Sequence, residues 1–419
     1  MEGVDVPCHF LCPISLQLMK DPVTISTGIT YDRESIEEWL FSCRNKTCPV
    51  TKQVLHDEDP TPNHTLRRLI QSWCTLNASR GVEPIPTPKA PIDKTQIAKL
   101  ISDAKRFPHL RMKCLSRLRS ISLESDRNRS CLEAAGAVDF LASIIKNSND
   151  SISSPEVEAF DDGTSSTDLT RLSDEALSTL YHLKISESQN KALISKDGGF
   201  VESLIEVLKH GNYQSRAYSI MLLKSLYEVA DPIQLVSVGR EFFFEIVSVL
   251  HDQVSRQATK AALKLLVEIC PWGRNRVKAV ECGAVFVLIQ ILLETSEKTE
   301  CELTLTVLDL LCRCADGRAE LLQHEAGLAI VSKSILRVSD VASDRAVKIL
   351  CSVCKYSASN RVLQEMLQVG AVAKLCLVLL VDSRLRSKER ARDILRLHTR
   401  AWSNSPCIPL HLMSSYPSS

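Results

Sequence analysis

The side chains near the N-terminus that are best suited to chemistry are cysteines and histidines. They are Cys8, His9, Cys12, Cys43, Cys48, His56 and His64. An interleaved double zinc site needs its ligands in successive pairs, and no Cys or His lies between Cys12 and Cys43. Nucleophilic catalysis by a thiol needs a neighbouring base and acid, which neither Cys12 nor Cys48 has in the sequence. We therefore expect no metal, no cofactor and no covalent nucleophile.

The same region contains an ordered series of short motifs that predicts a small α+β domain. Asp21-Pro22-Val23 opens a strand, Gly28 supplies a hairpin turn, and Thr30-Tyr31 begins the returning strand. Asp32 and Asn63 are predicted N-caps of two helices. The apolar faces of these helices comprise Ile36, Trp39 and Leu40 in the first and Leu66, Leu69, Ile70 and Trp73 in the second.

These motifs resemble the U-box, the zinc-free relative of the RING domain of ubiquitin ligases. The resemblance covers residues 5–79 and rests on LCPISLQLMKDPVT (11–24), GITYDRESIEEWL (28–40), CPVTK (48–52) and PNHTLRRLIQSW (62–73). It implies that hydrogen bonds and ion pairs replace zinc. The side chains expected to supply them are Asp21, Ser26, Thr27, Thr30, Asp32, Arg33 and Glu37.

The U-box resemblance also implies a docking groove for a ubiquitin-conjugating enzyme that carries thioester-linked ubiquitin. The groove residues carried over are Ile14, Leu16, Trp39 and Pro49, with Lys52 as a cation facing both partners. For Leu16 and Trp39 the alternative is a place in the core of the domain. For Lys52 the alternative is an ordinary surface lysine, because its point charge lacks the planar fork of arginine.

Residues 80–93 form a proline-rich linker, and residues 94–402 repeat with a period near 42. Glycines recur at 199, 239, 283, 327 and 370, each followed by an apolar helix and then a longer closing helix. Such units leave one apolar face open that only a neighbouring unit can cover. The pattern resembles armadillo repeats, which the Gly-Ala and Gly-Gly turns favour over a HEAT array. The fold class is therefore mostly α: a small U-box followed by an armadillo solenoid.

Two segments do not fit the repeat. An acidic, Ser-rich stretch within residues 147–170 lengthens one unit, and we expect it to be a mobile loop, either a tolerated insertion or a binding segment. Residues 403–419 are expected to be a disordered tail.

One U-box, a proline linker and an armadillo array together resemble plant U-box armadillo ubiquitin ligases, in particular a short group associated with immune and stress signalling. The resemblance implies that the array binds protein substrates. Its alternative is a non-catalytic armadillo scaffold. The candidate substrate contacts are five cations near the start of the closing helices: Arg216, Arg256, Lys260, Arg345 and Arg390. The alternative for each is an ordinary surface charge.

Thr61-Pro62 and Thr87-Pro88 match proline-directed phosphorylation sites, although both also suit ordinary turns. In the family, U-boxes pair along the edge on which Thr61 lies, so the resemblance implies self-association. A phosphate on Thr61 would add about −1.5 to −2 charge at this edge.

The formal net charge of +1 predicts no binding of nucleic acid. We interpret the basic segment 384–400 as a solvated helix and not as a nucleic-acid site. We expect neither a signal peptide nor a membrane span. Sixteen cysteines among 419 residues indicate a reducing compartment, so the expected location is the cytoplasm, with the nucleus as a second one.

Overall fold

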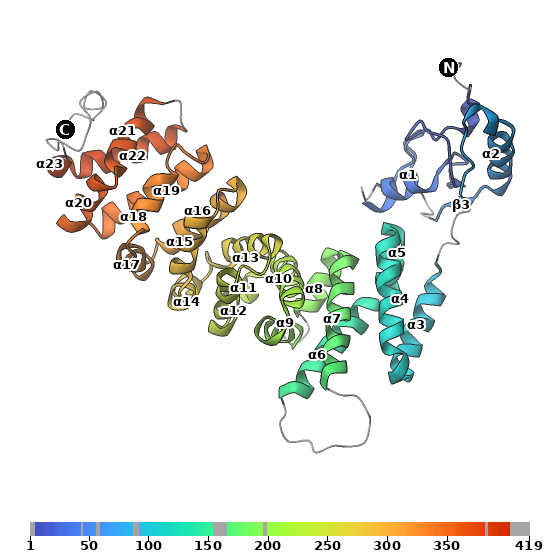
Figure 1. The fold of residues 1–419 in the computed structure, drawn as a ribbon, viewed down its shortest axis with the longest axis horizontal. Coiled ribbons are helices and arrows are strands. Elements are labelled where there is room, and N and C mark those ends of the chain that lie inside the picture. Colours follow the sequence, from blue (N-terminus) through green and yellow to red (C-terminus); the bar gives the residue numbers. More distant parts are fainter. Residues whose placement is uncertain are drawn as a thin grey trace. The chain divides into compact units, whose positions relative to one another are not determined.

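The computed structural model describes residues 5–42, 45–55, 59–86, 92–153, 166–195, 199–381 and 384–402 (Figure 1). The chain divides into two compact units, residues 1–144 with 164–185, and residues 145–163 with 186–419. The first unit contains the N-terminal α+β domain, and the second contains most of the helical array.

The N-terminal domain contains the two strands and two helices that the motifs predict. Its elements are η1 (Cys8–Phe10), β1 (Pro22–Thr24), β2 (Thr30–Asp32), α1 (Arg33–Glu37), η2 (Glu38–Ser42), β3 (Thr61–Pro62), α2 (His64–Leu76) and η3 (Ala78–Arg80). The strands form an antiparallel sheet in the order β2-β1-β3. Gly28 turns the β1–β2 hairpin at φ +81°, a conformation that glycine adopts without steric cost.

The core of this domain gathers side chains from β1, β2, α1, η2 and α2 and from the loops between the elements. Met19, Val23, Tyr31, Ile36 and Ile70 are at most 1% exposed. Trp39, Leu66 and Trp73 are partly buried against this core. Leu69 departs from the predicted apolar face of α2, because its side chain is 54% exposed.

The remaining described elements are helical. They are α3 (Lys94–Arg106), η4 (Pro108–Leu110), α4 (Arg111–Glu124), α5 (Asp126–Ala134), α6 (Ala137–Ser153), α7 (Ser166–Leu183), α8 (Glu187–Ser195), α9 (Gly199–His210), α10 (Tyr213–Tyr227), α11 (Pro232–Val236), α12 (Arg240–His251), α13 (Arg256–Ile269), α14 (Asn275–Glu281), α15 (Ala284–Glu294), α16 (Lys298–Leu311), α17 (Ala315–Gln323), α18 (Gly327–Ser334), α19 (Asp340–Tyr356), α20 (Asn360–Gln368), α21 (Ala371–Leu380), α22 (Leu385–Leu397) and α23 (Thr399–Trp402).

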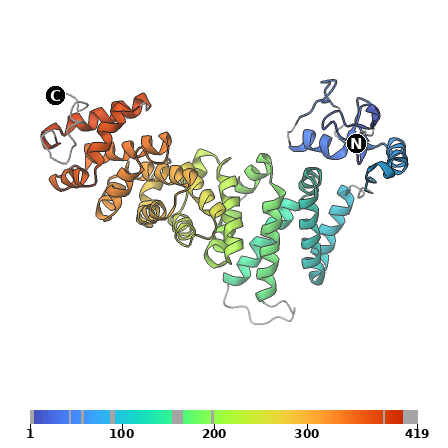
Figure 2. The same cartoon turned by 45° about the horizontal axis from the view of Figure 1, so that its top comes forward.

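From α8 onward the helices fall into successive groups of three, as the repeat period predicts. The long closing helices α10, α13, α16, α19 and α22 pack side by side in that order (Figures 1 and 2). Apolar side chains on these helices are buried between them: Leu263, Leu308 and Leu350 have no exposed surface. Each group thus buries its open face against the next.

The repeating glycines have two different roles. Gly283 and Gly370 adopt φ of +80° and +70° directly before α15 and α21, as expected of a turn glycine. Gly239 does not, because its φ is −73°. Gly327 instead allows close packing: a Cβ there would lie 2.0 Å from the Leu321 carbonyl oxygen.

The range predicted for the acidic loop, residues 147–170, includes residues that are helical in the structure at both of its ends. Helix α6 continues through Ser153 and α7 begins at Ser166. The acidic residues between them, Thr87 in the linker, and the expected tail lie outside the described residues.

In the helical region from Ile92 to Trp402 no strand occurs among the residues that the structure describes. By length and composition, no single described helix could cross a membrane, and only α20 with α21, bent by 65°, passes that test as a pair.

Candidate functional site

Two loops of the N-terminal domain share a Cys-Pro-aliphatic-x-x-Gln pattern and the same backbone hydrogen bonds. They are Cys12–Gln17 (CPISLQ) and Cys48–Gln53 (CPVTKQ). In each, the cysteine N–H donates to the glutamine carbonyl at 2.8 Å. The fifth residue, Leu16 or Lys52, takes a left-handed φ of 56° or 60° and donates back to the cysteine carbonyl. The two loops are therefore rigid turns that project their third and fifth side chains.

The strand β2 ties both loops together through adjacent residues. The Asp32 N–H donates to Cys12 Sγ at 3.3 Å. The Tyr31 hydroxyl forms a 3.1 Å hydrogen bond with Cys48 Sγ. Thr27 Oγ1 and the Thr51 N–H also lie 3.4 Å from Cys48 Sγ. Protein donors thus surround both sulfur atoms.

These hydrogen bonds affect the ionisation of Cys48. Burial opposes the thiolate, but hydrogen bonds from Thr27, Thr51 and Tyr31 together lower the pKa of Cys48 to about 6. Burial is also the main cause that raises the pKa of Tyr31. Across the residues that the structure describes, no group of three or more His, Cys, Asp and Glu side chains could hold a metal ion.

Polar side chains fix the segment between the first loop and β1 to the start of α1. The Asp32 carboxylate accepts hydrogen bonds from the N–H groups of Lys20 and Asp21, both at 2.8 Å. Arg33 bridges Asp21 at 2.5 Å and Glu37 at 3.5 Å. Asp32 occupies the predicted N-cap position but its side chain caps no helical N–H. The predicted N-cap position is therefore confirmed, but the carboxylate accepts from the N–H groups of Lys20 and Asp21 and not from those of α1.

The structure brings Trp39 and Lys52 together. Trp39 Nε1 donates to the Thr47 carbonyl at 2.7 Å, which holds the indole against the second loop. Lys52 Nζ lies 5.5 Å from the centroid of the Trp39 ring, within cation–π distance. Trp39 is partly buried rather than fully in the core, and Pro49 is half-buried.

Ile14 and Leu16 are the exposed apolar tips of the first loop. Their side chains are 37% and 74% exposed, so neither fills the core. Sequence reasoning missed Val50, which is 53% exposed and stands in the second loop where Ile14 stands in the first. The repeat of Cys-Pro-aliphatic in the two loops was the signal for it.

Thr61 lies in the edge strand β3. Its partner in the register is Thr24 of β1, and its side chain is exposed. Asn63 follows directly and is the N-cap of α2, accepting from the Leu66 N–H at 3.0 Å, as predicted.

Four of the five candidate substrate cations are engaged within the helical array. The ion pairs are Arg216–Asp252 at 2.7 Å, Lys260–Glu297 at 3.1 Å, Arg345–Asp309 at 3.0 Å and Arg390–Asp344 at 2.7 Å. Each joins a closing helix to a residue of an adjacent helix or turn. Their role in substrate binding stays a prediction, and the structure adds a role in joining repeats.

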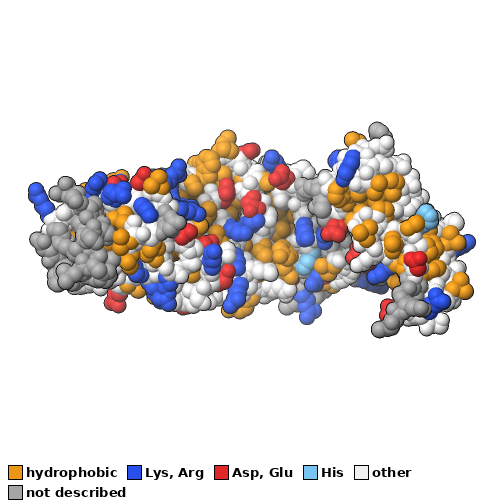
Figure 3. All heavy atoms as spheres, turned by 90° about the horizontal axis from the view of Figure 1, so that it is seen from above, with side chains coloured by type: hydrophobic (Ala, Val, Ile, Leu, Met, Phe, Trp, Pro, Cys, Tyr) orange, Lys and Arg blue, Asp and Glu red, His pale blue; other side chains and the backbone are white. Residues whose placement is uncertain are grey.

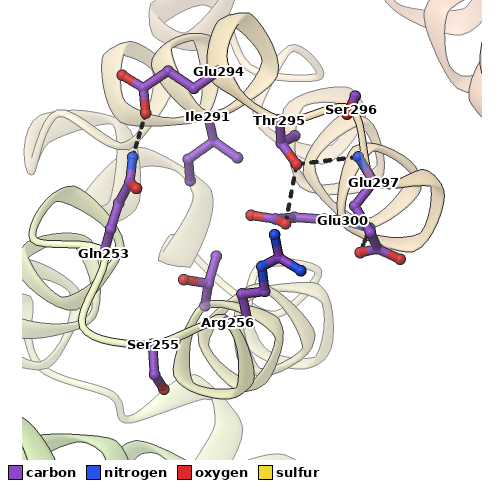
Figure 4. A pocket seen from close by; sticks show the side chains of 10 residues that line it. Gln253, Ser255, Arg256, Ile291, Glu294, Thr295, Ser296, Glu297 and Glu300 are labelled. Atoms are coloured by element: carbon purple, nitrogen blue, oxygen red, sulfur yellow. Dashed lines mark hydrogen bonds between the residues drawn. The ribbon is translucent and has the colours of Figure 1, made fainter.

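Arg256 differs from the other four. It lines a cavity of about 260 Å³ between the start of α13 and the α15–α16 turn. Figure 4 shows its guanidinium below Glu300, with Ile291 on the opposite wall. Thr295 donates to Glu300 at 3.1 Å across the same cavity. Among the described residues Arg256 forms no ion pair.

Two family models match the chain. "U-box domain" matches residues 6–79 and "Plant U-box protein ARM repeat region" matches residues 96–418. Among solved structures, one titled for the interaction between cadherin and beta-catenin aligns with a TM-score of 0.61 at 14% identity, over 86% of this chain and 62% of that one. This likeness supports the armadillo fold alone.

Relatives from Arabidopsis thaliana align over nearly the whole length. E3 ubiquitin-protein ligase PUB22 is 52% identical over 99% of both chains. PUB23 is 52% identical over 99% of this chain and 98% of its own, and PUB24 is 37% identical over 99% and 96%. The chain belongs to the plant U-box family with armadillo repeats and is an E3 ubiquitin ligase, a ubiquitin transferase.

Proposed function

We propose that the N-terminal domain docks a ubiquitin-conjugating enzyme and holds its thioester-linked ubiquitin ready for attack by a substrate lysine. The observation that carries this proposal is the pair of matched loops, which presents Ile14, Leu16 and Val50 to solvent. A small exposed apolar cluster beside an aromatic side chain suits a binding hot spot. Hydrophobic side chains are visible over this end of the molecule, at the right of Figure 3.

The mechanism is proximity and orientation rather than covalent catalysis. Cys12 and Cys48 have no exposed surface and their sulfur atoms are held by hydrogen bonds, which does not suit a nucleophile. Lys52, above the Trp39 ring, supplies a positive charge at the edge of the proposed groove. We expect it to contribute less than the apolar residues, since a solvated lysine is a weak point contact.

The armadillo array holds the protein substrate in this proposal. Of the five candidate contacts, Arg256 is the one without an ion pair among the described residues, so its charge is left for a ligand. A role in plant immune and stress signalling, in the cytoplasm or the nucleus, is part of the proposal and rests on the family resemblance. A fluorescent fusion of the full chain in plant cells tests the location, and exclusion from both compartments would contradict it.

The first prediction tests the groove. In a reaction of activating enzyme, conjugating enzyme, ubiquitin and the full chain, Ile14→Ala or Trp39→Ala should reduce self-ubiquitination by about tenfold or more, because each truncates a hot-spot side chain. Leu76→Ala is the matched control, since Leu76 is 81% exposed on α2 of the same domain and outside the loops. Full activity of both groove variants would contradict the assignment, and a chain inactive without substitution would favour a scaffold.

A further inference from the structure

A second cavity lies one repeat beyond the Arg256 cavity, between the α15–α16 turn and α18. Its volume is about 300 Å³. We call it the basic pocket and define it by the cations Lys298, Lys333 and Arg337 and the apolar side chains Leu292, Leu293, Ile330 and Val338. All these residues belong to the second compact unit.

The three cations have no carboxylate partner among the described residues. Several other cations of the array are paired with a neighbouring helix or turn, as Arg345 is with Asp309 and Arg390 with Asp344. Lys298, Lys333 and Arg337 are exposed and form no ion pair in the described part of the chain. Glu294 is the one acidic residue that lines the pocket, and its carboxylate already accepts a hydrogen bond from Gln253.

A fourth cation adds to the positive potential. Lys374 of α21 donates to the Ser332 carbonyl of α18 at 2.6 Å, one residue before Lys333 in the chain. Burial, and then the positive charges of Arg337 and Lys333, lower the pKa of Lys374. Four cations near one cavity repel each other, and an anion there would relieve the repulsion.

The surrounding sequence has the same bias. Residues 313–402 contain 16 Lys and Arg against nine Asp and Glu, a formal charge of +7, whereas the whole chain carries +1. Figure 3 shows blue side chains over the C-terminal helices at its left. Such a field attracts acidic partners.

We propose that the basic pocket binds an acidic peptide segment of a protein partner, with an apolar side chain on the pocket floor and carboxylates against the three cations. This proposal rests on the array holding the substrate, and it names the substrate class. A peptide fits better than a nucleic acid, because nucleic acid needs a longer row of phosphate contacts and does not use an apolar floor.

Fluorescence anisotropy with the full chain tests it. The probe is a fluorescein-labelled peptide with one leucine between two runs of glutamate. The double variant Lys333→Glu/Arg337→Glu should bind about tenfold more weakly or worse, because two attractive contacts become repulsive. The matched control Lys264→Glu/Arg361→Glu makes the same change in charge at exposed residues outside the pocket and should bind as the unchanged chain does.

Three outcomes would overturn the proposal. They are equal loss in the two double variants, equal binding of a peptide with lysine in place of glutamate, and unchanged affinity when the leucine becomes serine. Preferential, pocket-dependent binding of duplex DNA or phosphatidylserine vesicles would also reject a peptide ligand. Self-ubiquitination should persist in both double variants. Peptide failure with normal self-ubiquitination therefore refutes the basic pocket alone, whereas an unchanged chain without self-ubiquitination refutes the proposed ligase mechanism.

Discussion

At the scale of the residue, Cys48 links the second loop to the core. Tyr31 is fully buried, and its hydroxyl has Cys48 Sγ as a partner at 3.1 Å. Cys48→Ala should therefore destabilise the N-terminal domain by about 1–3 kcal/mol, the usual cost when a buried polar group loses a hydrogen-bond partner. Thermal unfolding followed by tryptophan fluorescence measures the change. Cys8→Ala is the control, since Cys8 is exposed, and equal melting of both variants would contradict the role of this bond.

The same thiol predicts a dependence of stability on pH. The pKa of Cys48 is about 6 in the folded chain, below the 9.0 of an ordinary solvated cysteine, which the unfolded chain approximates. A lowered pKa means that the unfolded chain binds more protons between these values, so the free energy of unfolding rises with pH there. This stabilisation is fully present above pH 9 and is lost as the pH falls through about 6. Urea titrations at several pH values should show the slope in the unchanged chain and less of it in Cys48→Ala. Parallel slopes would rule the thiolate out.

At the scale of the element, Asn63 joins α2 to the sheet. Its Oδ1 caps the Leu66 N–H at 3.0 Å, and its Nδ2 lies 3.3 Å from the hydroxyls of Thr24 and Thr30. Asn63→Ala should cost about 1–2 kcal/mol through loss of the cap. Asn63→Asp keeps the acceptor and loses only the donor, so its loss in chemical denaturation should be smaller. The reverse order would show that the sheet contacts dominate.

The edge strand β3 carries the second prediction at this scale. Thr61 is exposed beside Asn63, on the edge where we expect two U-boxes to pair. A negative charge would favour the N-terminus of α2 within one chain. Across a two-fold interface the charge is doubled and the copies repel. Thr61→Glu should therefore shift the protein toward monomer, whereas Thr61→Ala should not. Light scattering decides it, and identical masses of the two variants would remove this mechanism.

Local signals predicted the elements better than their contacts. The Asn63 cap and the five closing helices follow from residue type and periodicity, because both depend on neighbours three or four positions away. The Asp32 side chain caps no N–H of α1, because its carboxylate accepts hydrogen bonds from the N–H groups of Lys20 and Asp21, eleven or more residues earlier in the chain. The predicted bounds of the loop between α6 and α7 were wrong for another reason: polar residues form the last turns of α6 and the first turn of α7. No local pattern could predict which cation would meet which carboxylate.

At the scale of the whole molecule, the paired cations connect successive repeats. Asp309 is 4% exposed and contacts Arg345 of the next closing helix, and Asp344 is 8% exposed and contacts Arg390 of the one after. In a solenoid each repeat depends on its neighbour interfaces. Such contacts therefore help to determine whether the C-terminal repeats unfold with the array or before it.

Asp344→Ala tests this connection. Asp344 also contacts Lys348 at 2.9 Å and accepts from Ser387 at 2.8 Å. Burial opposes its charge, but Lys348, Ser387 and Arg390 together lower the pKa of Asp344. Its removal leaves two cations without their carboxylate and should cost about 3 kcal/mol. Hydrogen exchange should then rise in α19–α22 and remain unchanged in α8–α13. Asp393→Ala, an exposed acid on α22, should alter neither region. Uniform exchange across the array in Asp344→Ala would instead mean that the solenoid unfolds as one cooperative unit.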